Sequence, residues 1–419
     1  MGWKLSKQYR DSMLASSTAI IDRSPCDVAV GDGTALMYLA SSGKFLQTAV
    51  QVAGRLLKLV SAKSRAHYIV VCFDGPAIQM PPSRGKLYAT RYKQKTERQL
   101  AVDKDKGMII CAGRSYKPGT EPYNESELAE FDTQSKVSWS RLLASRKGKA
   151  VATSLLIRGL TIDAQANPRS SNFRLIISGG PDEVCLFYPR MAHAFDAIVA
   201  DQIKTVQWGE ADNRVTEAVK IIAARHTQKS IRVYTIDTDM VLQLMCVNFD
   251  TCPASLSLDL VKSNLIDVTK LRRSVGSTCE ERLSAVALLL CAKGCDYSNG
   301  LTMFGYRQQP LVNAAFLNQT PFIRRTEEGG LAIDTDVFSR VLKHVPRWSI
   351  KDTTPGEVRD EIVGLLTTLG LFSLVGPQNS PPGPREVALG DYTLGASSDP
   401  FAAICLEGFA GRGEPIVLE

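Results

Sequence analysis

Histidine is scarce in this sequence, and C-x-x-C cysteine pairs are absent. The four histidines stand far apart in the 419 residues and match neither the spacing of a metal site nor a catalytic triad. The ten cysteines include no C-x-x-C pair, and most stand in apolar stretches, so neither a zinc site nor a disulfide framework is expected. We therefore expect reduced core cysteines and an intracellular protein of the nucleus or cytoplasm.

Long apolar runs are also lacking. No stretch is long enough to cross a bilayer, and the opening MGWKLSKQYR has no apolar signal-peptide core, so no membrane partner is expected. Gly2 and Ser6 loosely fit a myristoylation pattern, a reading that we disfavour.

A strong charge of one sign is missing as well. The chain has 50 basic and 43 acidic residues, a formal net charge of +7 and a pI near 8.8. This mild excess favours an anionic partner without identifying one. A hydrophobic fraction of 44% with 22% charged residues is typical of a soluble protein with a sizeable core.

Short apolar runs that end in aspartate or glycine mark the expected strands. Residues 27–33 and 67–76 enclose a helical pattern at 34–63 without a hairpin signal, which predicts a β-α-β unit. The strand pattern resumes at 173–180 and 230–239. Because continuous apolar runs are typical of strands buried on both faces, we predict a three-layer α/β fold with a central, mostly parallel sheet.

Composition divides the chain into three parts. Residues 1–310 are predicted to form the α/β domain, with a basic helical insertion at about 80–168. Residues 311–375 are expected to be a helical C-terminal extension, and the Pro-rich stretch PQNSPPGPRE belongs to a linker and tail at 376–419.

The insertion begins with a basic stretch in which tyrosines alternate with charges. Its candidate nucleic-acid contacts are Arg84, Lys86, Arg91, Lys93 and Lys95. Residues seven apart share a face of a helix, so Arg84 lies with Arg91 and Lys86 with Lys93 if the stretch is helical. Such a run is either a solvated surface helix or an arch that contacts phosphates.

Acidic residues follow the expected strands. Asp32, Asp74 and the pair Asp237 and Asp239 come after apolar runs, and ligands of parallel sheets bind at this edge. Glu210 and Asp212 open a helix, and Asp296 stands in a Gly-Cys-Asp-Tyr turn. Seven carboxylates in one cleft would repel one another, which divalent cations such as Mg²⁺ relieve. Singly, each acid is equally explained as a helix cap or turn residue.

The ordered motifs GDG (31–33), FDGP (73–76), GEAD (209–212), IDTD (236–239) and GCDY (294–297) resemble those of the flap endonuclease/XPG-like structure-specific 5′ nucleases, which have a PIN-like fold. The resemblance implies catalytic, metal-binding carboxylates at Asp32, Asp74, Glu210, Asp212, Asp237, Asp239 and Asp296. Asp212 is a conservative departure, since the family usually has Glu there. The likeness covers roughly residues 1–310.

The resemblance also implies the cofactors and the mode of action. Two Mg²⁺ or Mn²⁺ ions would hydrolyse phosphodiester bonds, the first held by Asp32, Asp74, Glu210 and Asp212 and the second mainly by Asp237, Asp239 and Asp296. Tyr38 occupies the place of a tyrosine that stacks on a substrate base, and Gly2 that of a glycine near the active site. The implied activity is cleavage at 5′ flaps or junctions, or 5′ exonuclease action, in DNA replication, repair or recombination.

Two departures bear on the substrate and the partners. The stretch SNGLTMFGYRQQPL (298–311) keeps Gly300 and Gly305 but not the glycine-rich duplex-binding pattern of the cellular enzymes, and no sliding-clamp peptide is evident. The divergence resembles viral members, the poxvirus flap-endonuclease-like protein and the herpesvirus host-shutoff ribonuclease, which would place the chain in an infected cell. We expect a monomer that binds DNA in preference to RNA.

Rival interpretations come from other classes. A host-shutoff-like mRNA endoribonuclease would keep the same carboxylates, and an inactive nucleic-acid binder on the nuclease fold would typically lose several of them. A haloacid-dehalogenase-type phosphatase needs a nucleophilic aspartate where this chain has Val30. A structural protein whose acids are caps does not explain their order after the strands.

Overall fold

The computed structural model describes the main body of the chain and a few shorter pieces. The described residues are 25–43, 45–66, 68–75, 94–167, 173–181, 184–188, 211–225, 229–237, 239–247, 253–261, 265–285, 321–325, 330–334, 336–337, 340, 373–375 and 393–395. The statements below concern these residues.

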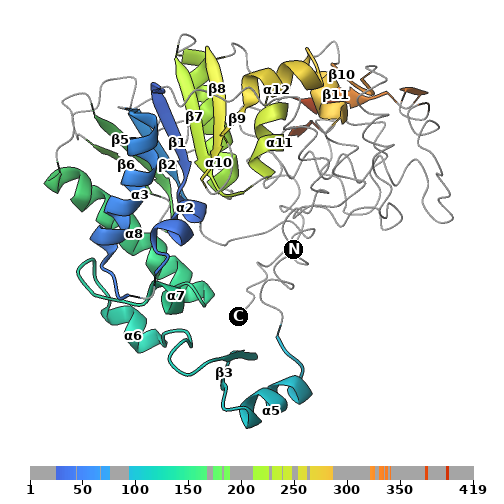
Figure 1. Ribbon diagram of the computed structural model, residues 1–419. Helices are drawn as coiled ribbons and strands as arrows, with labels where there is room; N and C mark the ends of the chain where they lie inside the picture. Colours follow the sequence, from blue (N-terminus) through green and yellow to red (C-terminus); the bar gives the residue numbers. More distant parts are fainter. Residues whose placement is uncertain are drawn as a thin grey trace.

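A seven-stranded sheet forms the centre of the protein (Figure 1). Its strands, in sheet order, are β6 (Val184–Tyr188), β5 (Arg174–Gly179), β2 (Tyr68–Cys72), β1 (Val28–Asp32), β7 (Ser230–Thr235), β8 (Ser255–Leu260) and β9 (Leu265–Asp267). The five strands from β5 to β8 run parallel, and β6 and β9 are antiparallel edges. The carboxyl ends of β5, β2, β1, β7 and β8 therefore lie along one edge.

Helices cover both faces of this sheet. On one face α2 (Gly33–Ala40), α3 (Ala49–Ser64) and α8 (Arg146–Ala166) share a core with Ala29 of β1 and Ile69 of β2. On the other face α10 (Ala211–Arg225) packs against β1 and β2, flanked by α11 (Asp239–Cys246) and α12 (Val268–Val275). Since successive strand residues point to opposite faces, the fully buried β1 needs both layers. The predicted three-layer α/β fold with a mostly parallel sheet is confirmed.

The helix predicted at 34–63 is two helices. Asp32 caps the start of α2, which ends at Ala40, and Thr48 begins α3 with a capping box that includes Gln51. The prediction missed the break because Phe45 continues the apolar spacing through the loop between the two helices. The separate start of α3 is explained by this capping box, which satisfies backbone N–H groups that a continuous helix would pair internally.

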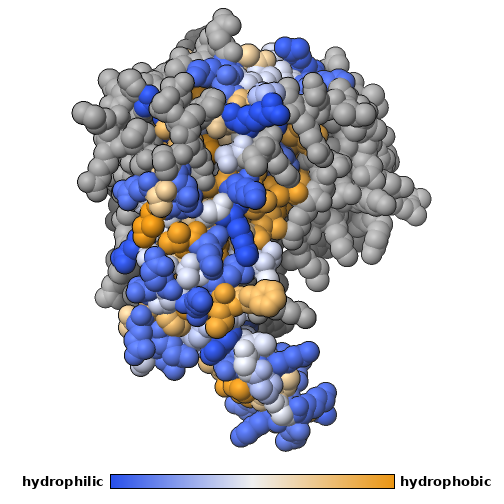
Figure 2. Space-filling view, turned by 60° about the vertical axis from the view of Figure 1, so that its left-hand side comes forward, coloured by the Kyte–Doolittle hydropathy of each residue, from blue (hydrophilic) through white to orange (hydrophobic). Residues whose placement is uncertain are grey.

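The insertion contains a projecting part, residues 94–117, which we call the arm. It consists of α5 (Glu97–Asp105) and the hairpin of β3 (Ile109–Cys111) and β4 (Arg114–Tyr116). Figures 1 and 2 show it extending away from the sheet, with apolar surface among hydrophilic side chains. The exposed apolar residues there are Val102, Ile109 and Ile110. Most of the predicted basic stretch, from Arg84 to Lys93, lies outside the described residues.

The base of the insertion is fastened to the body. α6 (Glu125–Glu130) and α7 (Trp139–Leu142) lead into α8, and Val137 exchanges backbone hydrogen bonds of 3.0 and 3.2 Å with Gln47. The buried Trp139 donates its ring N–H to the Gln47 carbonyl at 3.1 Å. The loop between α2 and α3 is thus held by residues about ninety positions further along the chain, and α8 belongs to the body.

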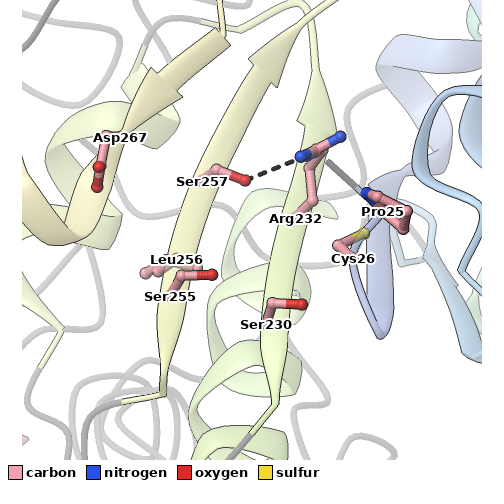
Figure 3. Close-up of a pocket in the computed structure, with 8 residues that line it drawn as sticks. All are labelled: Pro25, Cys26, Ser230, Arg232, Ser255, Leu256, Ser257 and Asp267. Carbon is pink, nitrogen blue, oxygen red and sulfur yellow. Dashed lines mark hydrogen bonds between the residues drawn. The ribbon is translucent and has the colours of Figure 1, made fainter. Parts of the chain in front are cut away.

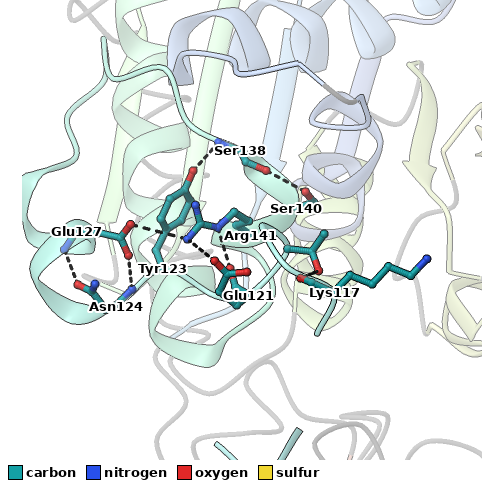
Figure 4. A network of polar contacts seen from close by, with 9 residues as sticks. Lys117, Glu121, Tyr123, Asn124, Glu127, Ser138, Ser140 and Arg141 are labelled. Carbon is teal, nitrogen blue, oxygen red and sulfur yellow. Dashed lines mark hydrogen bonds and ion pairs between the residues drawn. The ribbon is translucent and has the colours of Figure 1, made fainter. Parts of the chain in front are cut away.

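A polar network around Arg141 stabilises this base (Figure 4). The Arg141 guanidinium lies 4.0 Å from the centre of the Tyr123 ring and donates to the Glu121 carbonyl at 2.8 Å. The Tyr123 hydroxyl accepts from the Ser138 backbone N–H at 2.9 Å. Stacking and planar hydrogen bonding of this kind suit arginine and are poorly reproduced by lysine.

A second sheet corrects the prediction for the C-terminal region. The strands β10 (Ile323–Arg325), β11 (Gly330–Ile333), β13 (Thr393–Gly395) and β12 (Ser373–Val375) pair antiparallel in this order. The helical prediction for 311–375 is wrong at the first, second and fourth of these, and β13 lies in the predicted tail. The Gly329-Gly330 pair between two short runs was the hairpin signal that the helical interpretation overlooked.

Two further expectations concern the cysteines and the membrane. Cys26, Cys72, Cys246 and Cys279 are buried, Cys111 is half-buried, and none of these five cysteines forms a disulfide bond. Across the described residues, no helix combines the length and apolar character that a bilayer crossing requires.

Candidate active site

Three of the predicted acids meet at the carboxyl edge of the sheet. Asp32 ends the central strand β1, and Asp74 and Asp237 follow the neighbouring strands β2 and β7 by two residues each. Burial, and after it the charges of Asp74 and Asp237, raise the pKa of Asp32 to about 7, against the hydrogen bonds that the carboxylate accepts. The carboxylates of Asp74 and Asp237 are therefore each close enough to repel that of Asp32.

Hydrogen bonds fix the Asp32 carboxylate between a helix and a strand. One oxygen accepts from the Ala35 N–H at 2.9 Å as the cap of α2, and the other accepts from the Thr235 hydroxyl at 3.0 Å. The Thr235 oxygen accepts in turn from the Asp237 N–H at 3.0 Å. Thr235 thus aligns the end of β7 with the end of β1.

The Asp74 carboxylate forms an ion pair with a lysine and accepts a hydrogen bond from the start of a helix. Its Oδ2 forms an ion pair of 2.8 Å with the Lys149 ammonium from α8. Its Oδ1 accepts from the Ala211 N–H at 2.9 Å, at the start of α10, where the helix dipole favours negative charge. Its backbone N–H donates to the Thr34 hydroxyl at 3.0 Å.

The position of Asp74 is fixed by a close approach between the backbone after β2 and the backbone at the end of β5. The Phe73 N–H donates to the Ser178 carbonyl at 2.8 Å, and the Gly180 N–H donates to the Asp74 carbonyl at 3.0 Å. Gly179 has φ +98°, and a side chain there would bring its Cβ within 2.2 Å of the Phe73 carbonyl oxygen. Glycine is required because both the backbone angle and the space exclude a Cβ.

The first turn of α10 adds a buried acid and a buried base. Asp212 is buried and follows Ala211, whose N–H binds Asp74. Arg214 is only 1% exposed, and its guanidinium donates to the Ser178 hydroxyl at 3.4 Å. A positive charge is thus buried among elements that carry the acids, where it offsets part of their negative field.

The other predicted site residues are distributed as follows. Asp239 begins α11, and Tyr38 lies on α2 with 43% of its surface exposed. Lys95 lies in the arm and pairs with Asp103 at 2.6 Å, so its phosphate contact stays a prediction. The residues outside the described part of the chain are Gly2, Arg84, Lys86, Arg91, Lys93, Glu210 and Asp296.

Three contributors escaped the sequence analysis as site residues: Lys149, Thr235 and Arg214. Lys149 stands in a second basic stretch, 140–150, but nothing in its spacing indicates a contact with Asp74, 75 positions away. Thr235 is the last residue of β7 and could have been suspected, since ligands of parallel sheets bind outside the carboxyl ends of the strands.

A group of three or more metal-ligating side chains in binding geometry is not found within the described residues. The donor chemistry nevertheless fits a divalent cation, because carboxylate oxygens are the ligands that Mg²⁺ prefers, and the negative charges of Asp74 and Asp237 contribute, after burial, to the raised pKa of Asp32. Lys149 supplies one positive charge at this edge and occupies an oxygen of Asp74.

Apolar side chains are exposed on the loop that follows α2. Phe45 is 83% and Leu46 58% exposed, near Tyr38 in the chain. α2 begins at Asp32 and its eight residues span about 12 Å, so this loop stands within one short helix of the acidic edge. An exposed aromatic side chain at such a place can stack on a base, and an aliphatic one can add apolar contact.

Comparison with known proteins gives a limited result. No family model and no curated protein matches the chain. Among solved structures, the T5 D15 protein co-crystallised with metal ions is 12% identical, with 82% of this chain and 88% of that chain covered and a TM-score of 0.37. The bacteriophage T5 D15 flap endonuclease in a pseudo-enzyme-product complex with DNA and metal ions is 11% identical, with 82% and 98% covered and a TM-score of 0.34. TM-scores this low carry no argument, so the function rests on the residues of this chain.

Proposed function

We propose that this protein is a divalent-metal-dependent nuclease of the flap-endonuclease type that hydrolyses phosphodiester bonds in DNA at 5′ flaps, junctions or ends. The observation that carries the proposal is the meeting of Asp32, Asp74 and Asp237 at one sheet edge, with the pKa of Asp32 raised to about 7. The ordered acidic motifs of the sequence support the same activity.

The chain's own residues would divide the work as follows. Asp32, Asp74 and Asp237 would hold the metal ions, together with the remaining predicted acids, Glu210, Asp212, Asp239 and Asp296. When bound, two such ions activate water and stabilise the charge that develops on the phosphate. Thr235 and the Ala211 N–H hold two of the carboxylates in place, which limits the reorganisation needed during the reaction.

Lys149 would have two roles, one toward Asp74 and one toward the substrate phosphate. In the structure its ammonium pairs with Asp74, and both side chains are partly exposed. A cation that binds Asp74 would compete with Lys149 for the carboxylate, and the released ammonium would stand where a substrate phosphate approaches. We assign Lys149 as a positioning residue for Asp74 and a phosphate contact.

Replacing Lys149 with methionine is expected to tighten Mg²⁺ binding while lowering kcat about 10- to 100-fold, because the competing charge and the phosphate contact are both removed. The matched control is Lys147→Met, two residues earlier on α8, where the ammonium is largely exposed and pairs with an exposed Glu125. Mg²⁺ titrations of the cleavage rate check both. Equal effects of the two variants would contradict the assignment.

Substrate binding would combine charge and stacking. The arm carries six basic and three acidic residues, so its contribution to affinity should fall steeply with salt. Tyr38, Phe45 and Leu46 would contact unpaired bases, a contact worth about 1–3 kcal/mol for each stacked base and tolerant of sequence.

A substrate panel tests the proposal directly. A 5′-flap DNA, a plain duplex, a single strand and a capped RNA are each incubated with Mg²⁺, with Mn²⁺ or with a chelator. Flap cleavage that requires metal is expected, and a preparation of the Asp237→Ala/Asp239→Ala variant controls for contaminating nucleases. Cleavage of RNA alone would favour the host-shutoff-like activity, and salt-sensitive binding without cleavage would favour an inactive binder.

A further inference from the structure

A fully buried glutamine lies between α10 and α11, the two helices that carry predicted metal ligands at their starts. Asp212 stands in the first turn of α10, and Asp239 is the first residue of α11. The two helices contact each other on one face of the sheet (Figure 1). Gln243 of α11 has none of its surface exposed. A buried amide needs hydrogen-bond partners, because burying it without them costs about 1–3 kcal/mol.

Both polar atoms of the Gln243 side chain contact the first turns of α10. The amide nitrogen donates to the Asn213 Oδ1 at 3.4 Å. The Thr216 hydroxyl shares its one proton between the Gln243 Oε1, 3.3 Å away, and the Asp212 carbonyl, 2.8 Å away. Gln243 is therefore connected to Asp212 through Thr216, and directly to the residue that follows Asp212.

The far end of α11 is held by two buried arginines. Arg272 donates to the carbonyls of Leu244 and Met245 at 2.6 and 3.0 Å. The Nε of Arg282 donates to the Met245 carbonyl at 2.9 Å. These carbonyls belong to the last turn of the helix, which lacks internal partners and favours a positive charge. With Gln243 bound to α10, the eight-residue α11 has little freedom to shift.

The bridge is polar although the surroundings of Gln243 are apolar. Its neighbours Met240 and Leu244 on α11 are fully buried, so a hydrophobic side chain would also pack there. Apolar contacts allow two helices to slide, whereas a hydrogen-bonded network specifies one arrangement. Because Mg²⁺ demands a nearly ideal octahedral set of oxygens, ligands carried by two helices need a defined separation.

We propose that Gln243 is a positioning residue that sets the separation between the starts of α10 and α11, and so between Asp212 and Asp239, an inference that rests on the proposed metal-dependent function. Gln243 would contact neither metal nor substrate, since it is fully buried and α10 engages both of its polar atoms. Replacing residues that act on metal ligands in this way typically weakens metal binding about 10- to 100-fold.

Calorimetric titration of the full-length protein with Mn²⁺ tests this role independently of catalysis. Gln243→Met keeps the length of the side chain but makes neither contact, so it should weaken Mn²⁺ binding about tenfold. The cleavage rate at saturating Mn²⁺ should fall only a few-fold, because excess metal restores occupancy. The control Ser257→Ala also removes a buried hydrogen bond between side chains, that of 3.2 Å from the Arg232 Nε, beside a cavity near the amino-terminal ends of β7 and β8 (Figure 3). Its Mn²⁺ affinity should be unchanged.

A double-mutant cycle separates positioning from a general loss of stability. In an Asp239→Asn background, Gln243→Met should have little further effect on Mn²⁺ affinity, because the carboxylate that it positions is already gone. A general loss of stability would instead weaken binding equally in both backgrounds.

If circular dichroism shows that Gln243→Met does not fold, a milder pair of variants replaces it. Thr216→Val removes the hydroxyl that contacts Gln243 and should weaken Mn²⁺ binding about threefold. Thr161→Val is its matched control, because the Thr161 hydroxyl likewise donates to the carbonyl four residues earlier, that of Ile157, but on α8. This control should leave the affinity unchanged.

The outcomes distinguish the role of Gln243 from the proposed function. Wild-type affinity in Gln243→Met, an equal loss in the Asp239→Asn background, or equal affinities of Thr216→Val and Thr161→Val would each overturn the role of Gln243 and leave the nuclease proposal standing. A wild-type protein that neither binds Mn²⁺ nor cleaves any substrate of the panel would overturn both.

Discussion

Asp32→Asn is expected to reduce metal-dependent cleavage on the order of 10³-fold while the protein remains folded. Asparagine keeps the shape of the side chain, and its amide oxygen can still cap α2 by accepting from the Ala35 N–H. The substitution removes the central carboxylate of the acidic edge. A neutral amide can neither bind a divalent cation as strongly nor help to hold the ions that stabilise the transition state. The cleavage rate on the preferred substrate of the panel measures the loss.

The same variant has an opposite effect on stability. Asp32 has a folded-state pKa of about 7 against an ordinary value of 3.8, so the folded metal-free protein binds the proton more tightly than the unfolded chain. The stability contributed by this proton is complete below the unfolded pKa and is lost as the pH rises to about 7. As the pH rises from 4 to 7, the free energy of unfolding of the wild type should therefore fall relative to that of Asp32→Asn. Urea denaturation without metal would show this difference.

Asp163→Asn is the matched control for this prediction. Asp163 is another buried carboxylate, on α8, where it accepts a hydrogen bond of 2.9 Å from Asn167. Its replacement should leave the cleavage rate within a few-fold of the wild type. If Asp32→Asn retained full activity, or if both variants lost activity equally, the assignment of Asp32 to the catalytic edge would be refuted.

Gly179→Ala is expected to destabilise the protein by about 3 kcal/mol or more. The positive φ costs a Cβ-bearing residue about 1–2 kcal/mol, and the overlap with the Phe73 carbonyl forces a backbone shift that costs about 1–3 kcal/mol more. Relief of the overlap requires β5 to move from the end of β2, which also displaces Asp74. Denaturation by urea should show the lower free energy of unfolding.

Gly119→Ala measures the cost of a positive φ alone, without the steric overlap that a side chain meets at Gly179. Gly119 has φ +79° in an exposed turn, and nothing lies within 4 Å of a Cβ placed there. This variant should lose only about 1–2 kcal/mol. A Gly179→Ala protein no less stable than Gly119→Ala would show that the approach of β5 to Phe73 is not rigid. Activity lost by Gly179→Ala under conditions where it is folded would indicate that Asp74 has moved.

Much of the fold was predictable because its central strands are buried on both faces. Continuous apolar runs such as 67–76 have few structural alternatives, and an aspartate after such a run stands at the ligand-binding edge of a parallel sheet. The break after α2 was missed because Phe45 in the loop continues the apolar spacing of the helix, and the C-terminal strands were missed because strands of three or four residues carry little periodic signal.

The sequence by itself determined the chemistry of the acidic edge: which strands end in carboxylates, and in what order. Only the tertiary structure decided which charges these acids face. Lys149 reaches Asp74 because α8 crosses the sheet beside α3, and Arg214 is buried because α10 packs on the opposite face. The contacts of Lys149 with Asp74 and of Arg214 with Ser178 join residues that are distant in the chain, so no local pattern of spacing encodes them. The strength of a charge interaction depends on separation and burial in space, which are properties of the packed layers.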